Sequence, residues 1–196
     1  MTGAHPEGRD EARDVERDLV IRAQRGDREA FGELAFRMGD RLLTIAQRIL
    51  RDVDQAEDAT QQTIVTVWRE LPKLRDPDRF EGWSYRILQN ACRAELRQAR
   101  RWSPTEIDSL PLDDVVGDPA LTLADRDELE RAFRRLPVEH RLVLVMQHYL
   151  GLTLEQIAER LEIPLGTARS RSHYAKRSMR AALEADARTS EGVRSA

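Results

Sequence analysis

The chain contains little of what secreted, membrane-spanning or metal-binding proteins require. Its 196 residues include one cysteine, Cys92, which excludes a disulfide framework or a thiolate metal cluster within one chain. No apolar run approaches the ~20 residues that cross a bilayer, and the N-terminus lacks the apolar core of a signal peptide. We therefore expect a cytoplasmic protein that does not insert into a membrane and that uses no metal and no cofactor.

Residues that carry catalytic chemistry are also sparse. Adjacent carboxylates such as Glu57 and Asp58 point apart on a helix. The histidines do not cluster with Cys92 or with paired carboxylates at the spacing of a metal site or a catalytic triad; they are His5, His140, His148 and His173. These absences argue against an enzyme.

Few aromatic residues and only short β-branched runs favour an all-α fold. Hydrophobic residues at 40% and charged residues at 34% suit packed helices with polar surfaces. The net charge of −3 does not by itself indicate a nucleic-acid partner. Any such signal must lie in how the charges are distributed along the chain.

The first part of the chain predicts core helices after a disordered start. Residues 1–14 are polar and are expected to be disordered, with a helix from about Val15. Gly26 suits a helix C-cap and Asp27 the next N-cap. Apolar stripes at 30–38 and 42–50 predict two further helices of the same domain.

A helix is predicted from Asp54 to about Leu71. Its core face comprises Ala56, Ala59, Thr63, Val67 and Leu71, with Ile64 and Trp68 alongside. Its opposite face comprises Glu57, Asp58, Gln61 and Gln62. This second face is either a solvated surface or a docking surface, and the residues alone leave both open.

A strongly basic helix is predicted from Trp83 to Arg101, after a loop from Pro72 to Gly82. The basic residues of the loop and helix are Lys73, Arg75, Arg79, Arg86, Arg93, Arg97, Arg100 and Arg101, and the nearby aromatics are Trp68, Phe80, Trp83 and Tyr85. Cations with interleaved aromatics suit single-stranded nucleic acid, because rings stack on bases while cations hold the backbone. Taken singly, Trp68 and Phe80 fit ordinary core packing better.

The composition turns acidic from Ser103 to Glu130, with nine acidic residues and one basic residue, Arg126. Prolines and a glycine punctuate this stretch, so residues 102–122 are expected to form a flexible linker. Extended, about 20 residues reach about 70 Å. The linker is either a solubilising tether or a mimic of nucleic acid.

The C-terminal domain, residues 123–184, contains a helix-turn-helix pattern. Thr153 and Gln156 have capping-box spacing at the start of a short helix. Pro164 ends that helix and suits the first position of the next. This arrangement is typical of proteins that read duplex DNA. Residues 185–196 are expected to be disordered.

The second helix of this pattern has no acidic residue from Gly166 to Arg180. Its cations are Arg169, Arg171, Lys176, Arg177 and Arg180. A basic run is often only a solvated helix face. On the second helix of a helix-turn-helix it favours DNA contacts, because phosphates and base edges there need cations.

With both basic helices in place, the chain resembles the extracytoplasmic-function group of bacterial sigma factors. Residues 52–101 resemble region 2 of that family and residues 136–183 resemble region 4. The resemblance implies two small helical domains, 15–101 and 123–184, joined by the acidic linker. It also implies a promoter-specificity subunit that acts with core RNA polymerase and catalyses nothing itself.

The resemblance further implies partners and site residues. Core polymerase would be bound through the clamp helices of its largest subunit, and through its flap, with a polymerase-binding face at Glu57, Asp58, Gln61 and Gln62. The −10 element would be bound by Lys73, Arg75, Phe80, Trp83, Arg86, Asn90, Arg93 and Arg97. The −35 element would be read by Thr167, Arg169, Ser170, Arg171, His173, Tyr174, Lys176 and Arg177. An anti-sigma factor is a further implied partner.

The sequence departs from the family pattern at Ile64, Ala94, Glu162, Ser172 and Tyr174. Glycine is usual in the turn where Glu162 stands. A large apolar residue is usual where Ser172 stands, so we expect Ser172 to leave the second helix less anchored by packing. The alternative function is a stand-alone helix-turn-helix regulator with an N-terminal effector or dimerisation domain. That alternative leaves the basic helix at 83–101 unexplained.

Overall fold

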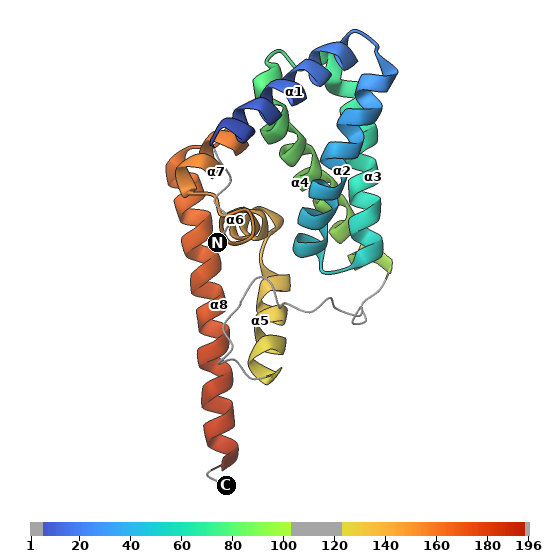
Figure 1. Cartoon of the computed structure of the whole chain (residues 1–196). Helices are drawn as coiled ribbons and strands as arrows, with labels where there is room; N and C mark the ends of the chain where they lie inside the picture. The colour runs from blue at the N-terminus through green and yellow to red at the C-terminus, as the bar shows by residue number, and fades with distance from the viewer. Residues whose placement is uncertain (1–5, 103–122, 195–196) are drawn as a thin grey trace.

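The computed structural model describes residues 6–102 and 123–194, which are helical with no strand in either range, so the all-α prediction is confirmed (Figure 1). The predicted linker lies outside the described residues apart from Trp102. The elements follow in the order α1 Pro6–Gln24, α2 Arg28–Leu50, α3 Val53–Glu70, η1 Leu71–Lys73, η2 Pro77–Arg79, α4 Phe80–Trp102, α5 Leu123–Arg135, α6 Val138–His148, α7 Leu154–Leu161 and α8 Leu165–Arg194.

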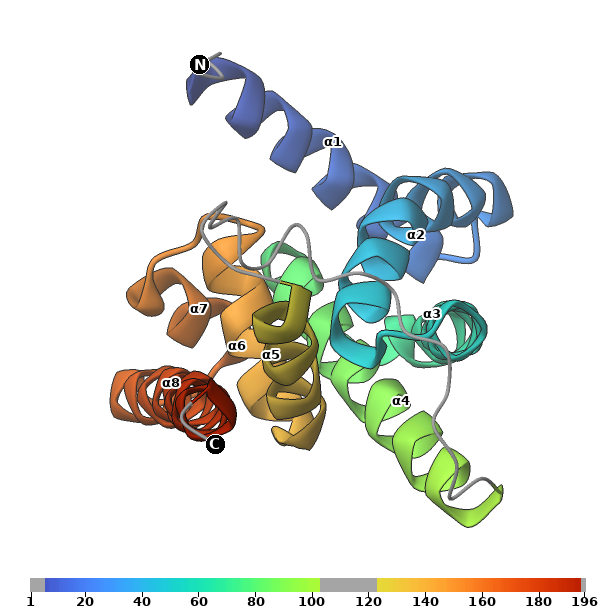
Figure 2. The ribbon, with the colours of Figure 1, turned by 90° about the horizontal axis from the view of Figure 1, so that it is seen from below.

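Helices α2, α3 and α4 pack on one another at the centre of an N-terminal bundle, and α1 crosses α2 (Figure 2). The predicted core face of α3 is confirmed, since its five residues from Ala56 to Leu71 are all buried. The stripes at 30–38 and 42–50 belong to the single helix α2 rather than to two helices. A glycine inside a helix such as α2 destabilises the helix only modestly. The burial of one continuous apolar stripe along α2 outweighs this destabilisation.

Helix boundaries follow the capping signals where a side chain can reach the backbone. Gly26 adopts a φ of 93°, and the Asp27 carboxylate accepts a hydrogen bond from the Ala30 amide at 3.0 Å. Asp52 caps α3 by accepting from the Gln55 amide at 2.9 Å. These caps provide hydrogen-bond acceptors for backbone amides that have no partner within the first helical turn.

Three boundaries differ from the predictions. Helix α1 begins at Pro6 rather than near Val15, because proline is tolerated at a first helical position. Helix α8 continues to Arg194, past the expected end at 184, since residues 184–190 are mostly helix formers without proline or glycine. Helix α4 begins at Phe80, which places Gly82 in its first turn instead of in the preceding loop.

The helix-turn-helix is formed by α7 and α8. The predicted capping box is confirmed: Thr153 accepts from the Gln156 amide at 3.2 Å, and the Gln156 side chain accepts from the Thr153 amide at 2.9 Å. Glu162 ends α7 in the left-handed conformation with a φ of 51°. Helix α8 begins at Leu165, so Pro164 stands one position before the helix and is not its first residue as predicted; its carbonyl accepts from the Thr167 amide at 2.8 Å.

The C-terminal bundle of α5 to α8 packs directly against the N-terminal bundle. Helix α6 contacts α2 and α4, and α7 contacts the start of α4 (Figures 1 and 2). The buried apolar side chains of both bundles form one contiguous cluster. Two predicted domains therefore share a core across their junction.

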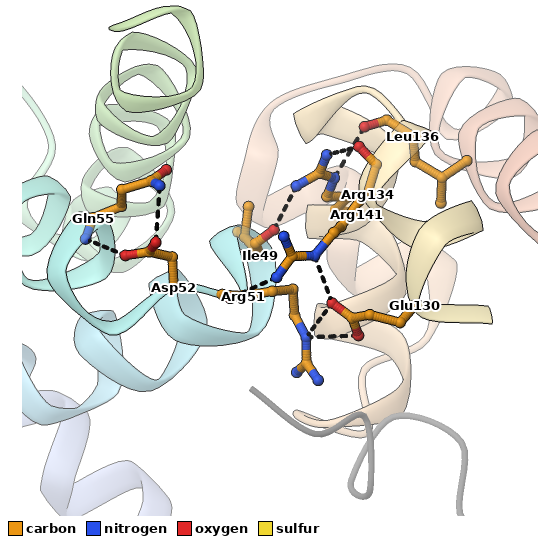
Figure 3. A network of polar contacts seen from close by, with 8 residues as sticks. All are labelled: Ile49, Arg51, Asp52, Gln55, Glu130, Arg134, Leu136 and Arg141. Atoms are coloured by element: carbon orange, nitrogen blue, oxygen red, sulfur yellow. Dashed lines mark hydrogen bonds and ion pairs between the residues drawn. The ribbon is translucent and has the colours of Figure 1, made fainter. Parts of the chain in front are cut away.

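Buried arginines hold the C-terminal end of α2 to α5 and α6 (Figure 3). The Arg141 guanidinium donates to the carbonyls of Leu136 at 3.0 Å and Ile49 at 2.8 Å, and also to that of Arg134. Arg51 caps α2 with a φ of 60° and pairs with Glu130 at 3.1 Å. Arg141 thus satisfies carbonyls at the end of its own neighbour α5 and, across the junction, the Ile49 carbonyl at the end of α2.

Candidate nucleic-acid interface

The first turns of α8 present the predicted duplex-reading residues to solvent. Arg169, Ser170, His173, Tyr174, Lys176 and Arg177 are exposed, and Thr167 and Arg171 are half-buried. The inward face of this segment is made of Ala168, Ser172 and Ala175, which are buried at helical spacing. Small inward residues bring α8 close to α6 and leave its basic face uncovered.

Ser172 stands where a large apolar residue is usual, and a hydrogen bond anchors it instead of apolar packing. Its side chain is buried, and its hydroxyl oxygen lies 3.0 Å from Oε1 of Gln147 on α6, which accepts the hydrogen bond. The expected loosening of α8 by Ser172 is therefore offset by a polar contact in place of packing.

We predict that Ser172→Ala lowers the free energy of unfolding by about 1 kcal/mol, because the partly buried Gln147 oxygen loses its donor. Urea denaturation would measure the change. Ser170→Ala is the matched control, since Ser170 is exposed and its hydroxyl bonds to the Thr167 carbonyl of its own helix. Equal stability of both variants would contradict an anchoring role for Ser172.

Tyr174 is held in place by a residue that the sequence patterns did not single out. The His140 ring on α6 meets the Tyr174 ring edge-on at a centroid distance of 4.9 Å. Burial lowers the pKa of His140, which favours the neutral ring. His140 thus orients Tyr174, which is 55% exposed and remains available to DNA.

Arg169 also has an exposed partner, Glu155 on α7, at 3.2 Å. Both side chains are more than half exposed, so the pair contributes little to stability. The contact holds the guanidinium near the start of α8 without burying it. Arg169 can therefore exchange Glu155 for a phosphate or a base edge at small cost.

The predicted basic residues of the N-terminal bundle fall into two groups. Lys73, Arg75 and Arg97 are exposed, and Asn90 is exposed while accepting from Arg93 at 3.0 Å. Arg86 and Arg93 are half-buried and pair with Glu162 and Glu139 of the C-terminal bundle. Arg86, Asn90, Arg93 and Arg97 lie on one side of α4 at helical spacing, part of which is covered, whereas Lys73 and Arg75 precede the helix.

The aromatic residues do not form one surface. Phe80 and Tyr85 are buried, which confirms core packing for Phe80, and Trp83 is half-buried with its ring 6.2 Å from that of Phe80. Trp68 is 42% exposed and contacts the Phe31 ring at 4.6 Å, so its expected core position is wrong. Phe80 supports the start of α4 here, and direct contact of its ring with DNA stays a prediction.

The polar face of α3 is exposed as predicted, at Glu57, Asp58, Gln61 and Gln62. A shallow hollow adjoins it, lined by Leu43, Thr60, Ile64 and Val65 together with Glu57 and Gln61. An apolar centre with a polar rim is the usual anatomy of a protein–protein interface, so this face has the features that docking requires. Periodicity missed the hollow because Leu43 comes from α2.

Cys92 is a small buried core residue, as expected. Burial raises the pKa of the Cys92 thiol to about 12, so it stays protonated. Within the described ranges no group of His, Cys, Asp and Glu side chains could hold a metal ion. None of the helices in those ranges is long and apolar enough to cross a membrane.

Both halves of the chain match models of known protein families. Residues 35–102 match the model for Sigma-70 region 2, and residues 132–181 match that for Sigma-70, region 4. The RNA polymerase sigma-H factor of Pseudomonas aeruginosa is 30% identical over 181 residues, covering 86% of this chain and 94% of that protein. The ECF RNA polymerase sigma factor SigM of Mycobacterium tuberculosis is 33% identical over 171 residues, covering 86% and 84%.

Solved structures show the same fold. CnrH, in complex with the cytosolic domain of CnrY, superposes with a TM-score of 0.58 at 25% identity, covering 88% of this chain and 99% of CnrH. The sigma factor RpoE of Bartonella quintana, in complex with the anti-sigma factor NepR, gives a TM-score of 0.55 at 21% identity, covering 80% and 98%.

Proposed function

The chain belongs to the extracytoplasmic-function group of bacterial sigma factors, and on that premise we propose how its two bundles divide promoter recognition. It directs RNA polymerase to specific promoters, and proteins of this family are initiation factors rather than enzymes. The observation that carries the proposal is the exposed basic face of the first turns of α8, the second helix of a helix-turn-helix, where no acidic residue occurs from Gly166 to Arg180. Because polymerase and chromosome lie in the bacterial cytoplasm, we place its action there.

Region 4, the C-terminal bundle, would insert α8 into the major groove at the −35 element. Base-edge contacts are assigned to Arg169, Ser170, His173 and Tyr174, which are all exposed. Phosphate contacts are assigned to Thr167, Arg171, Lys176 and Arg177. The His140 contact would fix the direction of the Tyr174 ring and so influence which base it meets.

Region 2, the N-terminal bundle, would bind and open the −10 element along α4 and the preceding loop. Unstacking costs a few kcal/mol per base, and stacking on aromatic rings returns about 1–3 kcal/mol per base. Trp83 is half-buried and is the ring assigned to stacking, while Arg86, Asn90, Arg93 and Arg97 on α4 are assigned to the DNA backbone. Lys73 and Arg75 extend this basic surface into the loop.

The polar face of α3 and its apolar hollow would dock on the clamp helices of core polymerase. We expect the double change Asp58→Lys and Gln61→Lys to weaken core binding about tenfold, because unpaired or like charges at an interface are costly. A titration with purified core polymerase would measure this. Asp127→Lys on α5 is the control, and normal core binding by the double variant would refute the docking face.

A protein inhibitor is a further proposed partner. Two of the solved structures with this fold are complexes, one with the cytosolic domain of CnrY and one with the anti-sigma factor NepR. An anti-sigma factor for this chain would need to cover basic surfaces of both regions. Acidic and apolar groups on such a partner would complement α4 and α8.

Run-off transcription with core polymerase on a randomised promoter library tests the function directly. We expect enrichment of promoters with two short conserved elements, one for each region. The alternative, a stand-alone regulator, predicts a sequence-specific gel shift by the whole protein without polymerase. Such a shift, together with no transcription in the library assay, would replace the sigma-factor assignment.

A further inference from the structure

Tyr174 brings a mostly apolar ring to a side of α8 whose other assigned residues are charged or polar. Its side chain is 55% exposed, and Ser170 and Arg177 are exposed one turn away on the same helix. The basic residues of this side suit phosphates and guanine edges. Apart from its hydroxyl group, the tyrosine ring offers no hydrogen bond of that kind, so it suits a different feature of the groove.

A ring from another helix holds Tyr174 on one side. His140 lies in the first turn of α6, with its ring centroid 4.9 Å from that of Tyr174 and the two planes inclined by 61°. This separation and inclination are favourable for an aromatic pair. Helix α6 therefore fixes the direction of the tyrosine ring before DNA arrives, which lowers the entropy cost of ordering that ring in a complex.

His140 contributes its ring rather than hydrogen bonds from Nδ1. Within the described ranges, the Nδ1 atom of His140 is buried and has no hydrogen-bond partner. Burial lowers the pKa of His140; the nearby Glu139 raises this pKa and Arg171 lowers it, and the net direction is downward. The ring is therefore neutral at pH 7. Since a neutral ring with an unpaired nitrogen acts through shape and packing, another planar ring should replace it.

Thymine presents the only apolar group among the base edges of the major groove. Every base pair offers hydrogen-bond donors or acceptors there, and thymine adds its C5-methyl group. A polar edge placed against an aromatic ring loses water without gaining a hydrogen bond. A methyl group in the same place gains free energy when it leaves water. The ring of Tyr174 therefore suits thymine better than the other three bases.

Tyr174 and Arg169 meet different base pairs if α8 lies along the groove. Tyr174 is five positions after Arg169 on α8. Five residues of α-helix rise about 7.5 Å, which corresponds to about two base-pair steps of about 3.4 Å. The preference of the ring therefore belongs to a different position of the element from that read by the guanidinium, and the two effects can be measured separately.

Resting on the proposed function above, we propose that Tyr174 selects thymine at one base pair of the −35 element through the thymine methyl group, and that His140 is the positioning residue that holds the ring there. The support is the exposed tyrosine ring on the DNA-facing side of α8 and the edge-on contact from α6. His140 acts through Tyr174 and makes no DNA contact of its own in this arrangement. The pair adds a sequence preference that the cations of α8 do not supply.

Removal of single methyl groups from the DNA tests the thymine contact. Each thymine of the selected −35 element is replaced in turn by deoxyuridine, which lacks only the 5-methyl group. We expect wild type to bind about fourfold more weakly at one position, the loss that corresponds to one buried methyl group. Tyr174→Ala should show no loss at that position. The proposal is wrong if no position is sensitive in wild type, or if the sensitivity persists in Tyr174→Ala.

Variants of His140 test its positioning role. His140→Ala should reduce the deoxyuridine effect to about twofold or less, whereas His140→Phe, which keeps a planar ring, should retain the effect of about fourfold. His148→Ala changes an exposed histidine at the end of the same helix and is the matched control, with the wild-type effect expected. An unchanged effect in His140→Ala, or a lost effect in His140→Phe, would show that the His140 ring does not position Tyr174.

The deoxyuridine effect is a ratio of two affinities measured with one protein. A general loss of stability weakens binding to every duplex alike, so it does not mimic a change confined to one position. The salt slope of log K should be the same for wild type and for the His140 variants, because the phosphate contacts remain.

The measurements are made on two preparations of the full chain. One is the holoenzyme on the promoter enriched by run-off transcription, and the other is the chain alone on duplexes that it selects from the same randomised library. Absence of transcription would overturn the proposed function, and the second preparation would still decide the thymine contact. Absence of sequence-specific duplex binding in both preparations would overturn both.

Discussion

Replacing Arg141 with alanine is expected to lower the free energy of unfolding by about 3 kcal/mol or more, because two buried carbonyls and one partly buried carbonyl lose a charged donor. The side chain is 2% exposed and donates to Leu136, Ile49 and Arg134. Water cannot easily reach these oxygens once the guanidinium is gone, and a cavity remains in its place. Chemical denaturation of the full chain would measure the loss.

Arg141→Lys provides a sharper version of the same experiment. A lysine keeps the charge but cannot present donors to carbonyls in three directions from one planar group, so it should recover only a minor part of the lost stability. Arg135→Ala, at an exposed position on α5, is the control. A loss at Arg141→Ala no greater than that at Arg135→Ala would show that the junction contributes little.

Arg169→Ala is expected to weaken promoter binding by the holoenzyme by about 1–3 kcal/mol and to relax the preference at one base pair. The guanidinium is exposed on the DNA-facing side of α8, and its pairing with Glu155 is weak. Competition binding on a set of single-base promoter variants would measure both effects.

Lys176→Ala supplies the contrast, because Lys176 is assigned to phosphate. It should weaken binding about equally on every promoter variant and reduce the salt slope of log K by about 1. If Arg169→Ala instead transcribes its own promoter as well as wild type does, Arg169 does not read a base.

Much of the fold follows from local signals. Asp27, Asp52 and the pair Thr153–Gln156 cap helices because each side chain reaches an amide only a few residues away. The buried face of α3 follows from the helical repeat. The ends of α1 and α8 were predicted less well, because polar composition does not exclude a helix when its residues are good helix formers.

The candidate site was predicted in part. The exposed face of α8 and the polar face of α3 follow from charge patterns at helical spacing. The environments of Ser172 and Trp68 were not predicted, because they depend on other helices. Gln147 of α6 accepts a hydrogen bond from Ser172, and Phe31 of α2 contacts Trp68. The contact of His140 with Tyr174 was missed for the same reason, because the two residues lie on different helices.

The sequence by itself determined the helices, their polar and apolar faces and the two basic surfaces, because these depend on spacings of a few residues. Tertiary structure alone decided how the two regions meet. The partners Arg79 and Glu162 are 83 residues apart, and no local periodicity relates them. Their contact exists because Gly82 lets α7 approach α4 and because Glu162 accepts a left-handed turn. Both depend on packing between elements that are distant in the chain.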